Sequence, residues 1–445
     1  MKKNNLLLLK HKGMKMKRVI LNIVAASMIC FIYACNTDDA PETKDVNIEE
    51  PPVELEPVET EPVEPAEPIV LTLRQAEIVA ADNRFTFNIF KEVSTLNGAN
   101  TFFSPLSLNM ALGMLYNGTS GDTRTEMAEA LGMAGFTDDE INEYYQKMSL
   151  ALLSIDPLTD IGIANSIWYR EGFTVKQPFI DLNMNYFDAM VEALDFDRPE
   201  AADIINDWCA DKTKDKIKEM IVAPISPDVI MYLINALYFK SKWQFEFDKA
   251  HTQQADFTKA DNQKIKVNMM EQTTTLPYYA DPYLQCVEMP YGNQAFSMVA
   301  VLGKNGMNID ELIEYLDNDK WQNIVNNLYA QNIRLKLPRF KIECELPLNK
   351  PVMNVGIQRI FGGGLWNISE DVHLFVSEIK QKTFVEVNEE GTEAAAVTVI
   401  QIDRTSFVGG DGPIPFFADR PFLYLIKEKS TGAILFIGRM DKPEE

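Results

Sequence analysis

Two stretches near residue 100 carry apolar side chains at intervals of three or four residues, the spacing of one helix face. We expect the first helix over residues 73–97, ended by Gly98. The second begins at Ser104-Pro105, because serine caps helix N-termini and proline fits the first turn, and it stops at Gly118. The apolar positions are Phe85, Ile89, Val93 and Leu96 in the first stretch, and Leu108, Leu112 and Leu115 in the second.

Later stretches rich in β-branched and aromatic residues predict strands. They are residues 163–169, 229–240, 423–426 and 433–438. The run 229–240 is so apolar that we expect it to be shielded from solvent.

One stretch near the C-terminus combines two structural preferences. It reads Glu389, Glu390, Gly391, Thr392, Glu393, Ala394, Ala395 and Ala396. Its alanines favour helix or open loop, whereas residues 397–402 have strong β preference. Every second residue is small or apolar, namely Thr392, Ala394, Ala396, Thr398, Ile400 and Ile402. This period suits a strand with one buried face, so we expect an exposed loop that can become a buried strand.

The first 35 residues have the pattern of a secretory signal. Seven basic residues precede a short apolar run that ends just before Cys35. The cysteine after Ile-Tyr-Ala resembles a bacterial lipobox, in which Cys35 becomes the lipid-bearing first residue, although Tyr33 is not a preferred lipobox residue. The alternative is an uncleaved membrane anchor, but the run is shorter than the ~20 residues of a spanning helix and contains Asn22 and Ser27.

Residues 36–70 follow with twelve acidic residues, one lysine and repeated Glu-Pro-Val-Glu units. Such a segment repels itself and cannot form a core, so we expect a disordered tether that extends ~3 Å per residue, up to ~100 Å. Its acidic start, residues 36–39, resembles surface-export signals of lipoproteins in some diderm bacteria. We therefore expect display at the surface of the outer membrane, with periplasmic retention as the alternative. The folded domain is expected over residues 71–445.

The folded domain is itself acidic. The whole chain carries −23; without the +7 of the signal and the −11 of the tether, residues 71–445 carry −19. Nucleic acid and anionic polysaccharides are therefore not expected as partners. A hydrophobic content of 46% over the chain is enough for a large core.

Cysteines and histidines are too few for several site chemistries. An odd, widely spaced set remains after the signal, Cys209, Cys286 and Cys344, which is no disulfide framework. His251 and His373 are the only histidines after the tether, and no zinc-ligand spacing includes them. No nucleophile-elbow sequence lies near either histidine, so a Ser-His hydrolase is not expected. We expect no metal, no cofactor and no enzymatic activity.

Six ordered motifs resemble the serpin family. Two are Glu-Glu-Gly-Thr-Glu-Ala-Ala-Ala-x-Thr at residues 389–398 and Phe-Ser-Pro-x-Ser at 103–107. The others are 118–132, the Asn-x-x-Tyr-Phe-Lys-x-x-Trp-x-x-x-Phe pattern at 235–247, 335–343 and 417–423. The resemblance implies an α+β serpin fold, with helices around a large central mixed β-sheet, two smaller sheets and an exposed reactive loop.

The resemblance also implies inhibition by a suicide substrate. A serine protease would cleave the loop, which would insert into the central sheet before the acyl-enzyme is hydrolysed. The hinge, residues 389–396, has small residues where such a strand must pass, which favours inhibition. The alternative is a non-inhibitory serpin that acts as a binding or chaperone-like module.

Further roles follow from the family resemblance. It implies that Ser104, Ser107 and Asn235 form a hydrogen-bonded cluster that lets the sheet open, with Gln381 in place of the usual histidine. Glutamine can donate and accept but cannot titrate. Arg339 and Glu389 would form an ion pair at the top of the sheet, which we expect to be exposed and therefore weak.

The cleaved bond and the partners follow from the same resemblance. Counting the usual seventeen residues from Glu389 places the bond between Thr405 and Ser406, which suits elastase-like or subtilisin-like proteases. A loop one residue shorter would present Arg404 to trypsin-like proteases. The stretch where some serpins bind heparin, residues 137–140, is acidic, so no such activation is expected. We expect a monomer held to the membrane by its lipid.

Overall fold

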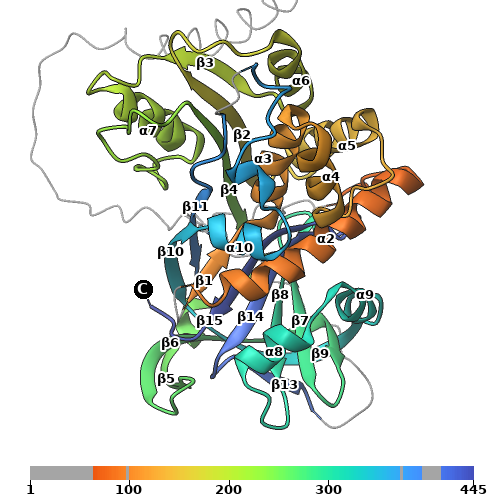
Figure 1. The fold of residues 1–445 in the computed structure, drawn as a ribbon. Coiled ribbons are helices and arrows are strands. Elements are labelled where there is room, and N and C mark those ends of the chain that lie inside the picture. Colours follow the sequence, from red (N-terminus) through yellow and green to blue (C-terminus); the bar gives the residue numbers. More distant parts are fainter. Residues whose placement is uncertain (1–63, 97–99, 371–373, 393–411, 445) are drawn as a thin grey trace, which may run out of the picture. The chain divides into compact units, whose positions relative to one another are not determined.

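The computed structural model describes residues 64–96, 100–370, 374–392 and 412–444. The described helices are α2 (Leu73–Val93), α3 (Pro105–Gly118), α4 (Gly121–Ala130), α5 (Asp138–Leu152), α6 (Gln177–Phe187), α7 (Ala201–Lys212), α8 (Ile309–Tyr315), α9 (Asn318–Asn326) and α10 (Asn349–Asn354). Two short 3-10 helices, η1 (Lys249–His251) and η2 (Arg359–Phe361), complete the set. Figure 1 shows α2 to α5 gathered along one side of the strands, with α7 apart from them.

The two helices predicted from the apolar spacing are present. Ser104 caps α3, its Oγ accepting from the Ser107 backbone N–H at 3.2 Å, and Gly118 is the last residue of the helix. Helix α2 ends at Val93, four residues before the predicted end. The Ser94 and Thr95 hydroxyls donate to backbone carbonyls three residues earlier, a local bond that competes with continued helix.

The first sheet has six strands in the order β10-β11-β12-β4-β2-β3. Their bounds are β2 (Thr159–Arg170), β3 (Met190–Leu194), β4 (Met231–Lys242), β10 (Phe340–Pro347), β11 (Lys380–Val387) and β12 (Gly391–Thr392). β2 and β3 are parallel and the other described pairs are antiparallel, so this sheet is mixed. Several apolar residues of β4 are only half-buried, in contrast to the prediction of a fully shielded strand.

The second sheet has nine strands, β1 (Thr101–Phe103), β5 (Gln253–Thr258), β6 (Lys264–Ala280), β7 (Leu284–Pro290), β8 (Phe296–Gly303), β9 (Tyr329–Pro338), β13 (Ile414–Phe417), β14 (Phe422–Glu428) and β15 (Ile434–Met440). The expected α+β architecture with a mixed central sheet is present, but the strands outside the six-stranded sheet form one continuous sheet in the described residues, where two smaller sheets were expected. The reason is the 17-residue β6, which pairs with β5, β7 and β9 and so joins both parts.

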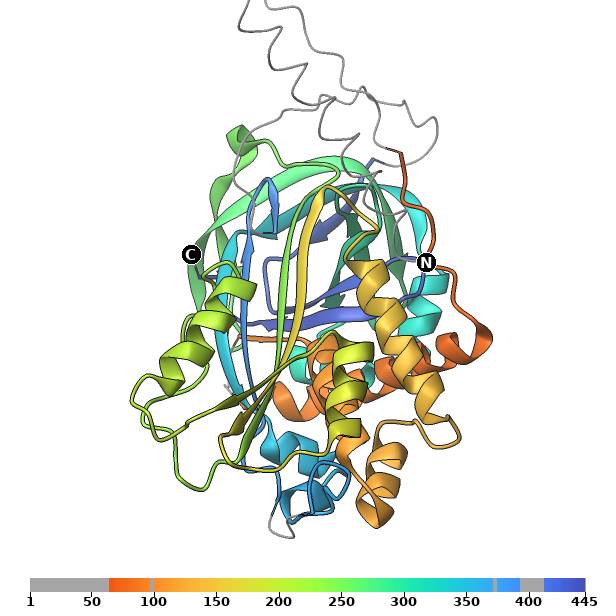
Figure 2. The same ribbon diagram turned by 90° about the horizontal axis from the view of Figure 1, so that it is seen from above.

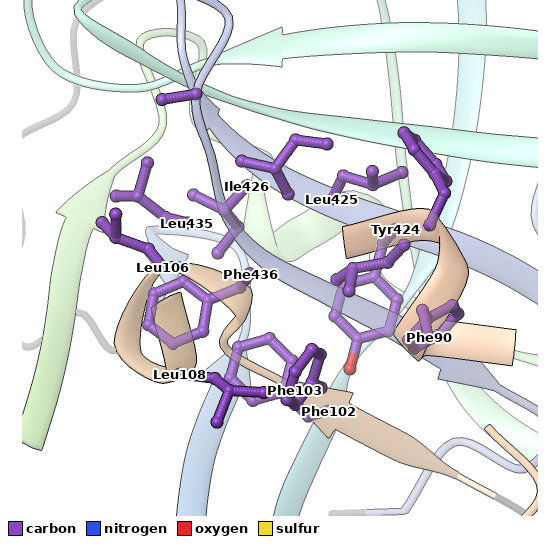
Figure 3. Close-up of a cluster of buried hydrophobic side chains, with 14 of the residues drawn as sticks. Phe90, Phe102, Phe103, Leu106, Leu108, Tyr424, Leu425, Ile426, Leu435 and Phe436 are labelled. Atoms are coloured by element: carbon purple, nitrogen blue, oxygen red, sulfur yellow. The ribbon is translucent and has the colours of Figure 1, made fainter. Parts of the chain in front are cut away.

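The main core lies between α2, α3 and the two sheets. Figure 3 shows the side chains of β1 and α3 packed against β14 and β15. The rings of Phe102 and Phe436 stack at 4.8 Å between centroids. Phe239 of β4 packs edge-on against Phe296 and Phe436, which fixes the six-stranded sheet where it crosses β14 and β15 (Figure 2). A second core under α7 includes Ile205.

The folded domain begins earlier than residue 71. The backbone N–H of Ala66 donates to the Asn293 carbonyl at 2.9 Å, and Ala66, Ile69 and Leu71 pack against the core. Residues 64–70, predicted to be disordered tether, therefore belong to the folded body, because apolar residues at short intervals interrupt the acidic composition there. Within the described residues, no helix is long and apolar enough to cross a membrane.

Candidate functional site

The hinge begins as the two-residue strand β12, which lies between β11 and β4. Thr392 is opposite Val387 of β11 and Ser241 of β4. Gly391 has φ +153°, and a Cβ on it would lie 2.1 Å from the Ser241 carbonyl oxygen. Only glycine fits this close approach, so the sequence at the hinge is matched to its backbone.

The side chain of Thr392 points into the body. It is 2% exposed, and its Oγ1 lies 2.5 Å from the Tyr291 hydroxyl. The Tyr291 ring stacks on Trp243 at 4.4 Å, and the Trp243 backbone N–H donates to the Glu390 carbonyl at 2.9 Å. Sequence reasoning placed Trp243 in a family motif without connecting it to the hinge, and it missed Tyr291, because no sequence pattern relates either residue to the distant hinge.

Arg339 and Glu389 form an ion pair. The Arg339 Nε donates to both carboxylate oxygens of Glu389 at 2.8 Å, and the Thr252 hydroxyl also donates to this carboxylate. Glu389 is 2% exposed, so the pair is more buried than expected because the β11–β12 turn holds the carboxylate inside the body. Burial alone would raise the pKa of Glu389, but the hydrogen bonds from Arg339 and Thr252 lower it below the usual value.

The structure brings together the four residues predicted to form the sheet-opening cluster. The Gln381 side chain accepts from the Ser104 backbone N–H at 2.7 Å and donates to the Ser104 carbonyl at 2.9 Å. The Ser107 hydroxyl donates to the Asn235 carbonyl at 3.5 Å. These contacts connect α3 with β11 on one side and with β4 on the other.

Asn165 is a further member that sequence reasoning missed. Its Oδ1 accepts from the Asn235 side chain at 2.6 Å, and it lies directly opposite Asn235 in the β2–β4 register. A polar residue inside the apolar run 163–169 was the available signal. The Oδ1 of Asn235 is buried with no hydrogen-bond partner, so this cluster keeps one unused acceptor.

A mostly apolar cavity of about 110 Å³ adjoins the cluster, and Ser107, Asn235 and Gln381 line part of it. Its other walls include Leu108 and Leu112 of α3, residues 231–234 of β4 and residues 376–380, which lead into β11. Within the described part of the chain, β4 and β11 are joined only through the two residues of β12. Below Thr392, no described strand pairs with the facing edges of β4 and β11.

The remaining predicted site residues lie outside the described residues. They are the signal with Cys35, the tether up to residue 63, Glu393, Ala394, Ala395 and Ala396 of the hinge, and Arg404, Thr405 and Ser406 of the loop. In the described ranges, no group of three or more His, Cys, Asp or Glu side chains is arranged to hold a metal ion.

Known proteins resemble this chain over most of its length. A family model described as "Serpin (serine protease inhibitor)" matches residues 80–443. The chain belongs to the serpin family. This serpin is 32% identical to Iripin-2 of Ixodes ricinus over 83% of its own chain and 94% of that protein. It is 30% identical to human Serpin I2, with 82% and 91% covered.

Solved serpins have the same fold. The thermophilic serpin tengpin in its native state matches with a TM-score of 0.76 and 28% identity, covering 85% of this serpin and 97% of that chain. Human thyroxine-binding globulin matches with a TM-score of 0.76 and 25% identity, covering 84% and 100%. The family is described as serine protease inhibitors, whereas this second neighbour is named for binding thyroxine.

Proposed function

We propose that this serpin inhibits serine proteases as a suicide substrate. The protease serine would attack the loop carbonyl, break the peptide bond, release the new N-terminus and remain attached through an ester. Insertion of the cleaved loop between β4 and β11 would then prevent hydrolysis of that ester. The serpin itself would catalyse nothing. The observation that supports this proposal is the register of β12.

Extending that register gives each later hinge residue two partners. Because the strands are antiparallel, each step along the loop is a step back along β4 and β11. Two steps beyond Thr392, Ala394 would be opposite Phe239 and Val385. The next two body-facing residues are Ala396, opposite Leu237 and Thr383, and Thr398, opposite Asn235 and Gln381.

The side chains match the environment at each position. Thr398 would bring a hydroxyl donor to the cluster, where Asn235 Oδ1 is buried without a partner. Ile400 would lie between Leu233 and Ile379, both of which line the apolar cavity. The small side chains of Ala394 and Ala396 would lie where the sheet packs tightly on the core, and the larger apolar side chain of Ile400 would lie at the cavity. This agreement favours insertion over a permanently exposed loop.

The proposed targets follow from the loop sequence. Thr405 before the cleaved bond and Ser406 after it favour elastase-like or subtilisin-like proteases with small apolar pockets. Arg404 would instead direct a trypsin-like protease, whose acidic pocket binds arginine. The first turn of α5 contains Asp138, Asp139 and Glu140, which supports the absence of activation by heparin.

The proposed location is the bacterial surface. The lipobox resemblance at Cys35 supports a lipid anchor, and the acidic segment 36–63 supports a tether between lipid and domain. The acidic residues after Cys35 favour display outside the outer membrane over periplasmic retention. In this arrangement a monomeric inhibitor would meet proteases in the surroundings of the cell.

One experiment tests the inhibitory function. The purified mature chain is incubated with an elastase-like, a subtilisin-like and a trypsin-like protease and run on a denaturing gel. We expect a covalent band at the summed mass with at least one of them. The mass of the released C-terminal peptide identifies the cleaved bond among residues 404–408. Cleaved fragments without a higher-mass band would instead indicate a non-inhibitory binding module.

A further inference from the structure

Residues 64–72, called the strap here, lie against the body just before α2. The backbone N–H of Ala66 donates to the Asn293 carbonyl at 2.9 Å, and that of Ile69 donates to the Ser430 hydroxyl oxygen at 2.9 Å. Both acceptors are in turns of the nine-stranded sheet, one between β7 and β8 and the other between β14 and β15. The strap therefore connects two turns that are far apart in sequence.

The strap sequence is suited to this role. Ala66 and Ile69 each follow a proline, which has no N–H and restricts the backbone to extended conformations. The three-residue interval between them is the repeat of a polyproline helix, so both N–H groups and both side chains face the body. The intervening Glu67 is exposed. A stiff segment loses little entropy on docking, so few contacts are enough to hold it.

A second attachment connects the strap to α5. The Lys147 ammonium donates to the Val70 carbonyl, and also to the Gln75 side chain at 3.2 Å. Helix α5 leads directly through residues 153–158 into β2. The strap is thus bound to the nine-stranded sheet on one side and to the element preceding β2 on the other.

Asn293 connects the strap to the hinge. The Asn293 side chain donates to the Ile155 carbonyl at 3.0 Å, on the segment that leads into β2. Its neighbour Gly292 donates its backbone N–H to the Lys242 carbonyl at the end of β4, at 2.9 Å. In the same turn, the Tyr291 hydroxyl contacts Thr392 of β12. The strap therefore binds the turn that contacts both the hinge and the strand beside it.

We propose that the strap is a latch that slows insertion of the uncleaved loop. A strand entering between β4 and β11 must push β4, with its partner β2, away from β11. The segment before β2 must then move relative to the nine-stranded sheet, and the strap contacts at Asn293 and Lys147 oppose this movement. The inference rests on the loop insertion proposed above, and it assigns to residues 64–72 a regulatory role.

The test compares two proline substitutions in the full mature chain. Ala66→Pro removes the N–H that binds Asn293, whereas the matched control Glu67→Pro adds the same stiffness at an exposed strap position. Each protein is warmed below its melting temperature. The rate at which it becomes resistant to heat and its loop becomes resistant to proteolysis is measured. We expect about fivefold to tenfold faster conversion for Ala66→Pro, since one hydrogen bond is lost, and the wild-type rate for the control.

These readouts do not depend on inhibition. Equal conversion rates for Ala66→Pro and wild type would overturn the latch, whether or not covalent complexes form. Faster unfolding of Ala66→Pro without formation of the heat-resistant species would also overturn it, because the strap would then only stabilise the fold. Faster conversion without complexes from the wild type would support the latch and contradict the inhibitory function. Ile69→Asp, which removes the half-buried strap side chain, gives an independent second variant.

Discussion

Ile400 is the residue whose substitution tests the insertion register most sharply. In the inserted strand, its side chain would lie between Leu233 and Ile379 over the apolar cavity of about 110 Å³. Complete burial of an isoleucine side chain is worth about 1.5–3 kcal/mol. An aspartate there would lose this gain and would also place a carboxylate among aliphatic groups, which costs several kcal/mol more. Ile400→Asp should therefore remove roughly 4 kcal/mol or more of the driving force for insertion.

The assay measures how often cleavage ends in inhibition. We expect Ile400→Asp to be cleaved at the wild-type rate but to yield mostly free fragments, because deacylation would outrun the slowed insertion. The matched control is Gln401→Asp, whose side chain would face the opposite side of the sheet. It should retain most of the covalent complex. Heat resistance of the cleaved protein gives a second readout that does not depend on the target protease.

Two results would refute the register. Full complex yield and full heat resistance in Ile400→Asp would mean that position 400 does not enter the cavity. If Ile400→Asp and Gln401→Asp lowered complex yield and heat resistance equally, added charge in the loop would be the cause. The side of the sheet that each side chain faces would then have no effect. Either result would leave the general insertion mechanism open while removing the residue-by-residue pairing derived from β12.

Three further predictions concern the described body. Arg339→Met should lower the urea midpoint by the equivalent of about 1–3 kcal/mol, because the buried Glu389 carboxylate would lose its ion pair and keep the Thr252 hydroxyl as a donor. The low pKa of Glu389 means that its stabilising contribution is present above the ordinary pKa and is lost as pH falls. Burial raises the pKa of Asp82 to about 7, so its ionisation should cost roughly 4 kcal/mol as pH rises from about 4 to about 7, and Asp82→Asn should flatten that part of the midpoint-against-pH curve. Gly391→Ala should lower the thermal midpoint by several degrees, because its Cβ would meet the Ser241 carbonyl; an unchanged value would contradict the close approach.

The sequence predicted which residues form the hinge and its neighbouring strands better than it predicted how deeply their side chains are buried. Apolar spacing identified α3, a β-prone composition identified the strand that became β4, and the family resemblance identified Gln381 and Arg339. Burial of Glu389 could not be predicted, because it depends on the turn between β11 and β12 rather than on neighbouring residues. Charged residues are usually exposed, so a sequence argument assigns them to the surface unless the fold is known.

The prediction that residues 64–70 belong to the disordered tether was wrong for a different reason. Composition placed residues 64–70 in the tether, since glutamate and proline alternate there as they do upstream. The decisive groups are backbone N–H donors at Ala66 and Ile69, which any residue except proline supplies. Composition carries no information about such bonds, and only the positions of Asn293 and Ser430 in the fold reveal them.

The cavity and the unpaired strand edges both favour insertion of another strand into the native sheet. Around the cavity of about 110 Å³, apolar side chains such as Leu108, Leu112 and Leu233 lack close neighbours on one side, so their dispersion contacts are incomplete. The facing edges of β4 and β11 add backbone groups whose ladder partners are missing below Thr392 in the described chain. Both deficits disappear when one strand with alternating small and apolar residues enters. Filling the cavity without the loop, by Ala111→Leu on α3, should therefore stabilise the uninserted state and reduce complex yield, and unchanged values of both would contradict this account.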